Sequence, residues 1–554
     1  MKSNYKALFF AITLLVGSCS DKGGTPPNPK VPLMREVTID NVVAGSEVVY
    51  NVRSQPVIRI KFSEPLDPTT IANAVSLTES VSGSTAAITS TLTNQDSVIQ
   101  VQVSTPLLFL SKYRVTVSTA VKSSTGGALY APVPRNFMTG IDSSRKFPAI
   151  TEDSLMTLVQ KQTFKYFWDF GHPVSGLARE RNTSGDLVTS GGSGFGIMTI
   201  PVAIERGFIT RAEGLARMQK IVGFLTNTAV KVKGAYPHWL NGATGAIIPF
   251  STNDNGADLV ETSYLIMGLL TARQYFDGTN AAEIGLRADI NTLYENVEWD
   301  WFRNSNQNVL YWHYSPDKGW IMNMPIRGWN ECLITYVLAA SSPTHGIPKA
   351  VYTGGWAGGT GFINGNSYYG YTLPLGPSQG GPLFFEHYSF MGINPNGLSD
   401  VYANYATQTK NHTLINYQYC KTNPKGWQGY SDSCWGLTAS DIPAGYTASS
   451  PTNDIGVIAP TAALSSFPYT PTESMKALKF FYYVLGNKIW KEYGFVDAFS
   501  VQEPWFAPSF LAIDQGPIIV MIENHRTGLL WDLFTSCPEV KSGMLNLGFT
   551  APYL

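Results

Sequence analysis

Hydrophobic and polar residues alternate in short runs along the first part of the chain. Residues 58–62 read Ile-Arg-Ile-Lys-Phe, and residues 99–103 place Ile99, Val101 and Val103 on one face and two glutamines on the other. Side chains of a strand point alternately to opposite faces, so these runs predict half-buried strands. Gly/Pro turns separate the runs, and we therefore expect a β-sandwich over residues 33–141.

A helical period replaces this alternation after Thr151. Thr151 can cap a helix that continues to about residue 167. Further helices are predicted at residues 200–206, 211–226, 258–275, 281–298, 331–340, 400–406 and 472–485. Regular strands are few and the loops are long and aromatic. Residues 150–554 therefore predict an all-α (α/α) toroid rather than a TIM barrel, which needs regular strands.

The first thirty residues have the pattern of a targeting segment. Lys2 and Lys6 precede an apolar run at residues 7–16, which is too short to span a membrane. The run leads into Gly17-Ser18-Cys19 and resembles a bacterial lipoprotein signal, residues 1–19, in which Cys19 becomes the lipidated first residue. Residues 20–32 then form a flexible linker. The resemblance implies an outer-membrane lipoprotein facing the periplasm or the cell surface, and an ordinary signal peptide with an incidental cysteine is the alternative.

Composition narrows the class of ligand. Lys and Arg number 39 against 40 Asp and Glu, and charged residues make up 14% of the chain. This balance gives no field for steering nucleic acid, and we expect no nucleic-acid partner. Aromatic residues make up 12%, and all 13 tryptophans lie from Trp168 onward. That distribution favours a neutral, hydroxyl-rich ligand for the second domain and marks a boundary near residue 145.

Metal and nucleotide signals are weak. No CxxC, HxxxH or HExxH occurs, so we expect no metal site and no cofactor. Residues 191–196, GGSGFG, follow no hydrophobic strand, which disfavours nucleotide binding. Cys420 and Cys434 could form a disulfide in an oxidising compartment or remain buried thiols.

Three acids mark the first candidate site. Asp254, Asp258 and Glu261 are spaced i, i+4 and i+7, so on one helix they would share a face within roughly 60°. They fit a carboxylate cluster at the mouth of a cleft. A solvated acidic face, stabilised by the helix N-terminus, is the alternative.

Two further acids lie in apolar surroundings. Glu331 follows Trp329 and Asn330 at the start of an apolar helix, where a carboxylic acid acquires the raised pKa that a general acid requires. A capping-turn role is the alternative for Glu331. Asp514 is an isolated acid in an apolar run, and such a group is costly unless it is paired or used.

Aromatic loops accompany these acids. Flat rings stack on the apolar faces of sugars while neighbouring polar groups bind the hydroxyl groups. The candidate substrate-binding residues are His238, Trp239, Trp312, His313, Arg327, Trp329, His387, Trp435 and Asp441. Core packing is the alternative for any single ring.

Two resemblances to known families rest on these motifs. Residues 62–67 (FSEPLD) and 113–117 (YRVTV) resemble a bacterial Ig-like domain, expected to be a spacer. Residues 254–262 (DNGADLVET), 328–331 (GWNE), 435–441 (WGLTASD) and 522–531 (IENHRTGLLW) resemble the bacterial β-1,2-glucanases of glycoside hydrolase family 144. The latter resemblance implies an (α/α)6 toroid and hydrolysis of linear β-1,2-glucan by inversion.

The same resemblance implies roles for the acids. Glu331 matches the family's candidate general acid, and Asp254, Asp258 and Glu261 match its acidic cleft. Asp514 is the candidate base. The sequence thus predicts a monomeric endo-β-1,2-glucanase that releases sophoro-oligosaccharides. The alternatives are an exo-acting enzyme that releases sophorose, a glycan-binding lipoprotein without catalysis, and a β-eliminating enzyme, which the modest basic content near the acids disfavours.

Overall fold

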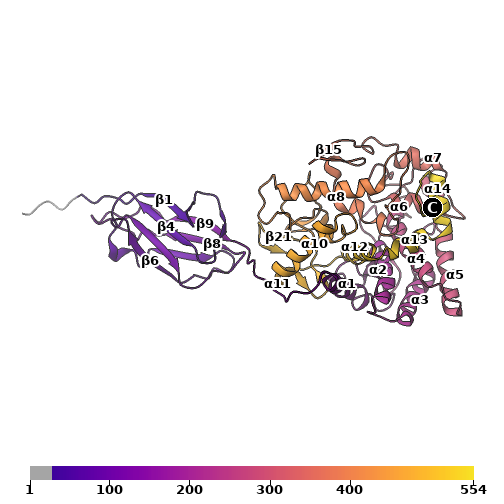
Figure 1. Cartoon of the computed structure of the whole chain (residues 1–554), viewed down its shortest axis with the longest axis horizontal. Coiled ribbons are helices and arrows are strands. Elements are labelled where there is room, and N and C mark those ends of the chain that lie inside the picture. The colour runs from indigo at the N-terminus through magenta and orange to yellow at the C-terminus, as the bar shows by residue number, and fades with distance from the viewer. Residues whose placement is uncertain (1–27) are drawn as a thin grey trace, which may run out of the picture. The chain divides into compact units, whose positions relative to one another are not determined.

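The structure is a computed structural model that describes residues 28–554. The lipoprotein signal with Cys19 lies outside the described residues, and so does most of the linker. The chain divides into two compact units, one up to Gly140 and the other Ile141–Leu554. Each unit is described by itself (Figure 1).

The first unit is a sandwich of two sheets. Its strands are β1 (Met34–Ile39), β2 (Val42–Val43), β3 (Val49–Val52), β4 (Val57–Phe62), β5 (Val75–Glu79), β6 (Ile88–Thr93), β7 (Val98–Val103), β8 (Lys112–Val117) and β9 (Val133–Thr139). One sheet has the order β2-β1-β4-β7-β6 and the other β3-β9-β8-β5.

The predicted alternation sets the register of this sandwich. In the antiparallel pair of β4 and β7, Ile58 lies opposite Val101 and Ile60 lies opposite Ile99. All four side chains are fully buried between the sheets, and the glutamines of β7 point away from the core. The predicted strands are therefore confirmed.

The second unit is helical. Its α-helices are α1 (Glu152–Trp168), α2 (Ser190–Glu205), α3 (Arg211–Asn227), α4 (Leu259–Tyr275), α5 (Ala281–Glu295), α6 (Leu333–Ser341), α7 (Lys349–Val351), α8 (Tyr405–Thr422), α9 (Pro460–Leu464), α10 (Pro471–Lys479), α11 (Gly486–Ile489), α12 (Ala512–Arg526), α13 (Leu529–Thr535) and α14 (Pro538–Leu547).

Short strands lie in the loops between these helices. They are β10 (Leu187–Thr189), β11 (Trp239–Asn241), β12 (Ile247–Ile248), β13 (Ala257–Asp258), β14 (His313–Tyr314), β15 (Ser367–Tyr368), β16 (Tyr371–Thr372), β17 (Ala439–Ile442), β18 (Gly445–Ala448), β19 (Trp490–Lys491), β20 (Gly494–Phe495), β21 (Phe499–Ser500) and β22 (Trp505–Phe506). The β13–β14 and β17–β18 ribbons carry candidate site residues.

Close helix packing at the centre of this unit depends on glycine. A Cβ atom on Gly194 of α2 would lie 2.2 Å from the carbonyl oxygen of Tyr264 in α4, and one on Gly268 of α4 would lie 2.2 Å from the carbonyl oxygen of Gly194. Hence the glycine-rich segment after β10 is the first part of a buried helix. The expected start of this helix at residue 200 was too late.

Two other helices differ from the expectation. The helix predicted at residues 400–406 begins only at Tyr405, because Asn404 caps α8 by accepting a hydrogen bond from the Thr407 amide. α8 then continues to Thr422. Many of the side chains that it buries are polar, so the sequence shows no helical period of hydrophobic residues here. α12, which contains Gly516-Pro517, is not among the helices expected from the sequence.

Two further findings concern disulfide formation and membrane-spanning helices. Cys332, Cys420, Cys434 and Cys537 are free and buried, so Cys420 and Cys434 form no disulfide in this structure. Among residues 28–554, no helix combines the length and the hydropathy that a membrane crossing needs.

Candidate active site

Asp258 is the centre of the first acidic cluster. It is fully buried and caps α4, where its Oδ1 accepts hydrogen bonds from the amides of Val260 (3.0 Å) and Glu261 (2.9 Å). Its Oδ2 lies 3.2 Å from His238 Nδ1 and 3.5 Å from His313 Nε2. One carboxylate therefore serves both the helix N-terminus and two imidazoles.

Asp254 and Glu261 complete this group, which we call the histidine–carboxylate cluster (His238, Asp254, Asp258, Glu261 and His313). Asp254 Oδ2 lies 3.4 Å from His313 Nε2, and His238 Nε2 lies 4.0 Å from Glu261 Oε1. Asp254 precedes the helix, so the expected single helical face was wrong for this residue. The β13–β14 ribbon brings the acids and His313 together instead, pairing Asp258 with His313.

Backbone and hydroxyl donors hold Glu261 in place. Its Oε2 accepts hydrogen bonds from the Gly191 amide (2.8 Å) and the Thr189 hydroxyl (3.3 Å). A Cβ atom at position 191 would lie 2.4 Å from the same oxygen. The glycine at the start of α2 therefore makes room for the acid on α4.

Charge within this cluster is largely compensated. Burial opposes ionisation of His238, but the charges of Glu261 and Asp258 raise its pKa to about 9. Burial would raise the pKa of Asp258, yet hydrogen bonds from His238 and His313 hold it well below its usual range. Burial raises the pKa of Asp254 and of Glu261. Asp258 is thus ionised and His238 is protonated at neutral pH.

Side chains of the histidine–carboxylate cluster are also possible metal ligands. Donor atoms of His238, Asp254 and Asp258 lie within 4.8 Å of one another, so these residues could hold a metal ion. The imidazolium of His238 already supplies positive charge to Asp258. The arrangement is therefore accounted for by ion pairing, and the expectation of no metal stays a prediction.

A second group of acids comes from different elements, and we call it the aspartate cluster (Asp441, Asp497 and Asp514). Asp514 lies in the first turn of α12 and is 2% exposed, while Asp497 lies between β20 and β21 and is 1% exposed. Asp497 Oδ2 accepts a hydrogen bond of 2.7 Å from the Asp441 amide. The Asp441 side chain is bound by Arg181 (3.2 Å) and by the Ser509 hydroxyl (2.5 Å).

Glu331 lies just before α6 and interacts with the histidine–carboxylate cluster. Burial raises its pKa to about 7, and the charges of Glu261 and Asp258 add to the shift. A carboxyl group with this pKa carries its proton over a wide pH range, as a general acid must. The raised pKa expected from its sequence context is present in the structure.

Two tyrosines lie among these acids. The Tyr264 hydroxyl is buried without a hydrogen-bond partner in the described structure, and the charge of Glu331 adds to the burial that raises its pKa. Burial also raises the pKa of Tyr388, and the charges of Asp514, Glu331 and Glu261 contribute. Glu331 and acids of both clusters therefore contribute charge at one buried hydroxyl.

A pocket of about 330 Å³ adjoins both clusters. Glu180 and Arg181 line it on the side of the aspartate cluster, and His238 lines it on the other. Its apolar surface comes from Trp239, Phe250, Tyr446, Leu511 and Ile513. The Phe250 ring centroid lies 4.7 Å from that of Trp239. Aromatic surface beside polar groups suits a sugar.

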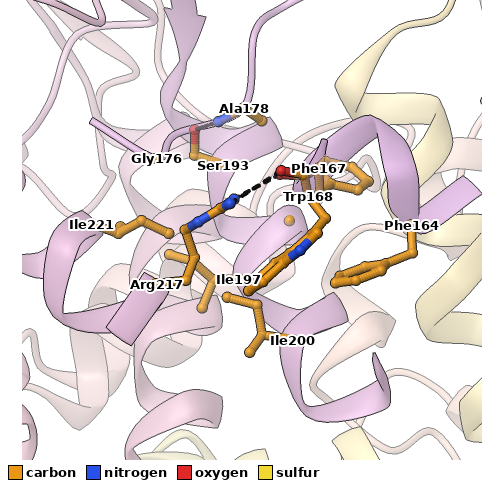
Figure 2. A pocket seen from close by; sticks show the side chains of 11 residues that line it. Phe164, Phe167, Trp168, Gly176, Ala178, Ser193, Ile197, Ile200, Arg217 and Ile221 are labelled. Atoms are coloured by element: carbon orange, nitrogen blue, oxygen red, sulfur yellow. Dashed lines mark hydrogen bonds between the residues drawn. The ribbon is translucent and has the colours of Figure 1, made fainter. Parts of the chain in front are cut away.

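A different hollow, shown in Figure 2, does not belong to this site. It encloses only about 10 Å³, room for at most one water. Arg217 stacks over Trp168 with its guanidinium carbon 4.2 Å from the ring centroid and donates to the carbonyl oxygen of Phe167 (3.2 Å). This hollow is a packing feature between α1, α2 and α3.

The structure separates the candidate binding residues into two groups. His238 and Trp239 line the pocket, His313 joins the histidine–carboxylate cluster, and Asp441 joins the aspartate cluster. Trp312 lies beside His313, with ring centroids 5.6 Å apart. These five residues lie in or next to the site.

The other four candidates have structural contacts instead. Trp329 is buried and donates to Glu386 (3.0 Å), and Trp435 is fully buried and donates to the carbonyl oxygen of Glu473 (3.2 Å). His387 is buried against the Ser466 hydroxyl (3.0 Å), and burial lowers its pKa to about 3. Arg327 is exposed and donates to the carbonyl oxygen of Gly354. Their role in substrate binding stays a prediction.

Sequence reasoning missed several residues of the site. Asp497 is an isolated acid in the apolar run Phe495–Phe499, the same signal that singled out Asp514. Arg181 and Tyr446 carry no distinctive motif, because only the fold brings them to the pocket. Tyr264 and Tyr388 look like ordinary core aromatics in the sequence.

A carboxyl group with a pKa raised to about 7 near other carboxyl groups, beside an aromatic pocket, fits the needs of glycosidic-bond hydrolysis. The arrangement is that of the glycoside hydrolase class. A family model described as "Putative glucoamylase" matches residues 323–538, and one described as "Bacterial Ig-like domain" matches residues 38–139. The chain belongs to the β-1,2-glucanase family, glycoside hydrolase family 144.

Three relatives support this membership. An endo-β-1,2-glucanase of Chitinophaga pinensis, solved with sophorotriose and glucose, is 52% identical over 73% of this chain and 100% of that chain, with a TM-score of 0.71. A solved β-1,2-glucanase of Parabacteroides distasonis is 37% identical over 94% of this chain and 73% of that chain, with a TM-score of 0.71.

The third relative is a curated protein of P. distasonis, an exo β-1,2-glucooligosaccharide sophorohydrolase acting at the non-reducing end. It is 47% identical over 428 residues, which cover 73% of this chain. The match spans 59% of the length of that relative.

Proposed function

We propose that this protein is an endo-β-1,2-glucanase that hydrolyses linear β-1,2-glucan to sophoro-oligosaccharides. The observation that carries the proposal is that Glu331, whose pKa burial raises to about 7, contributes charge at the same buried hydroxyl, that of Tyr388, as Glu261 and Asp514. The identity of 52% to the C. pinensis endo-enzyme supports the substrate and the internal cleavage.

The chemistry assigned to the acids is a single displacement with inversion. Glu331 donates its proton to the leaving glycosidic oxygen as the bond from the anomeric carbon breaks. Asp514 accepts a proton from the attacking water, whose oxygen forms the new bond on the opposite face. The neutral state of Glu331 and the placement of Asp514 in the same region support these roles.

The histidine–carboxylate cluster and the pocket bind sugar in this proposal. Asp254, Asp258 and Glu261 accept hydrogen bonds from substrate hydroxyl groups, while the imidazoles hold the carboxylates in place. Trp239 supplies a stacking surface within the pocket. We further propose that the helices form an (α/α)6 toroid around this cleft, as the family resemblance implies.

A substrate panel tests the proposal. Purified protein is incubated with β-1,2-, β-1,3-, β-1,4- and α-1,4-glucans, and new reducing ends are measured. We expect them only from the β-1,2-glucan. Binding without new reducing ends would overturn the enzyme assignment in favour of a glycan-binding protein, and unsaturated product absorbance would indicate β-elimination.

Exo action is the second candidate, favoured by the 47% identity to the sophorohydrolase. A product time course separates the two modes. Mixed oligosaccharides early in the reaction support endo action, whereas sophorose as the sole early product overturns it.

The role of Asp514 has its own test. We expect Asp514→Asn to lose nearly all turnover and to regain part of it with azide, a nucleophile that needs no base. Glu523→Gln serves as the control, because Glu523 is a buried acid on the same helix that pairs with Arg206 (2.7 Å). Unchanged turnover in Asp514→Asn would remove Asp514 from the base role.

We also propose that the protein is a monomer anchored through a lipid on Cys19, with the Ig-like domain as a spacer. The supporting feature is the apolar segment that ends at Gly17-Ser18-Cys19. Cys19→Ala is expected to move the protein from the membrane fraction to the soluble fraction on cell fractionation. Retention in the membrane fraction would contradict this anchor.

A further inference from the structure

Asp497 and Asp514 form a pair of carboxyl groups without a cation between them. Both side chains are almost fully buried. Asp497 Oδ1 and Asp514 Oδ2 are buried and have no hydrogen-bond donor as a partner among the described residues. Each carboxyl group acts on the pKa of the other as a side-chain hydrogen-bond partner, so the two lie side by side. Two ionised carboxylates cannot form such a bond, because both are acceptors.

The groups around the pair do not supply the positive charge or the hydrogen-bond donors that two ionised carboxylates would need. Arg181 contributes positive charge at Asp497, but its guanidinium binds Asp441 (3.2 Å) and Glu180 (3.0 Å). The other titratable groups facing Asp514 are acids or phenols, namely Asp441, Glu180, Tyr446 and Tyr388. Burial raises the pKa of Asp497 to about 7 and that of Asp514 well above its usual range.

We propose that Asp497 and Asp514 share one proton and act together as a single base with a net charge of −1. Asp497 is a positioning residue in this pair. The Asp441 amide holds one of its oxygens, and the other holds the shared proton against Asp514. The second oxygen of Asp514 is then left to accept a proton from water.

The catalytic role of the pair rests on the proposed function. As the water oxygen bonds to the anomeric carbon, its proton passes to Asp514, so the pair becomes neutral with two protons. The glycosidic carbon–oxygen bond breaks, and the leaving oxygen takes the proton of Glu331, which becomes anionic. Release of one proton from the pair and uptake of one by Glu331 restore the starting state.

Infrared spectroscopy at neutral pH tests the shared proton without any substrate. The background is Glu331→Gln, which removes the other carboxyl group with a pKa of about 7. We expect Asp497→Asn and Asp514→Asn each to lose one carbonyl band of a protonated carboxyl group, shifting in D₂O. Asp441→Asn is the matched control and is expected to keep the protonated band, since Asp441 pairs with Arg181 (3.2 Å) and takes no part in the shared proton.

Kinetics in the protein with native Glu331 separates positioning from simple structural support. The amide of Asp497→Asn can still donate to Asp514 but holds no transferable proton, so we expect kcat to fall about tenfold with KM unchanged. Asp497→Leu removes the contact and is expected to lower kcat further. Circular dichroism checks that each variant is folded.

Two results would overturn the inference. One is a spectrum in which neither Asp497→Asn nor Asp514→Asn loses a band of a protonated carboxyl group. The other is a folded Asp497→Leu variant with native kcat. A protein that shows the band but hydrolyses no β-1,2-glucan would instead contradict the proposed function and leave the proton-sharing pair intact.

Discussion

The two acidic clusters beside the pocket shift the pKa of a buried aspartate in opposite directions. In the histidine–carboxylate cluster, Asp258 lies within 3.5 Å of two imidazoles, and its pKa falls below the usual range. In the aspartate cluster, Asp514 faces another carboxyl group, and its pKa rises. Both aspartates are almost fully buried, so burial is not what distinguishes them.

The partner therefore decides the ionisation of a buried carboxyl group in this protein. An imidazole supplies the proton and the positive charge, which keeps Asp258 ionised. A second carboxyl group supplies neither, so a proton has to be retained. Glu331, with no ion-pair partner in the described structure, lies between these extremes with a pKa of about 7.

The largest expected effect comes from Glu331, which interacts with the histidine–carboxylate cluster. Glu331→Gln keeps the shape of the side chain but cannot donate a proton, so we expect kcat to fall by roughly 10³-fold with binding retained. In the unmodified enzyme, kcat/KM should decline as the pH rises through about 7. Initial rates across pH measure both. Substantial turnover in the variant would remove Glu331 from the acid role.

Asp258 tests the ion pairing of the histidine–carboxylate cluster. Asp258→Asn preserves the cap of α4 but leaves His238 and His313 without their shared counter-charge, and we expect a stability loss of about 3 kcal/mol at pH 7. The pKa of Asp258 is lowered on folding, so its contribution is present above its unfolded pKa of about 3.8 and is lost as the pH falls below that value. Denaturant unfolding at pH 3 and pH 7 measures the difference.

Thr151→Ala is the control for Asp258→Asn, because Thr151 caps α1 by accepting from the Ser154 amide (3.2 Å) without touching an imidazole. It should cost about 1 kcal/mol at both pH values. A loss for Asp258→Asn no larger than this would mean that the ion pairs contribute little.

Gly191 tests how tightly the fold holds Glu261 in the same cluster. In Gly191→Ala the new Cβ would lie 2.4 Å from Glu261 Oε2 and 2.9 Å from the Tyr264 ring, so we expect a stability loss of about 2 kcal/mol and reduced activity. Gly223→Ala in α3 is the matched control. Nothing lies within 4 Å of its added Cβ, and alanine favours a helix, so it should stabilise by about 0.5 kcal/mol. Equal effects at both positions would refute the steric argument.

The smallest expected effect concerns His238. Folding raises its pKa from 6.5 to about 9, so its stabilising contribution is complete below pH 6.5 and is lost as the pH rises through 9. Allowing for its partial exposure, we expect about 1 kcal/mol of stability to disappear between pH 6.5 and 9.5. His238→Gln should lack this decline. Parallel unfolding curves for the two proteins across that range would contradict the ion pairing.

Amphipathic elements could be predicted from the sequence because one face of each meets the core. The strands around Ile60 and Ile99 and the helix α3 follow this rule. Most of α8 was not predicted, because its buried face carries the polar side chains of Gln408, His412 and Asn416. Hydrogen bonds within the fold satisfy these groups. The first part of α2 was not predicted, because its glycines suggest a loop when their tertiary contacts are unknown.

The sequence by itself determined the two-domain division and the period of the main elements. It also singled out candidate functional acids on chemical grounds, namely Asp258, Glu261, Glu331 and Asp514. Those inferences need only neighbours along the chain. Only the tertiary structure decided which acids meet histidine and which meet another acid. The β21–β22 ribbon separates Asp497 from Asp514, and His313 is 55 residues from Asp258 in the chain. Their contacts, and the charge states these impose, therefore arise only when the helices and ribbons pack.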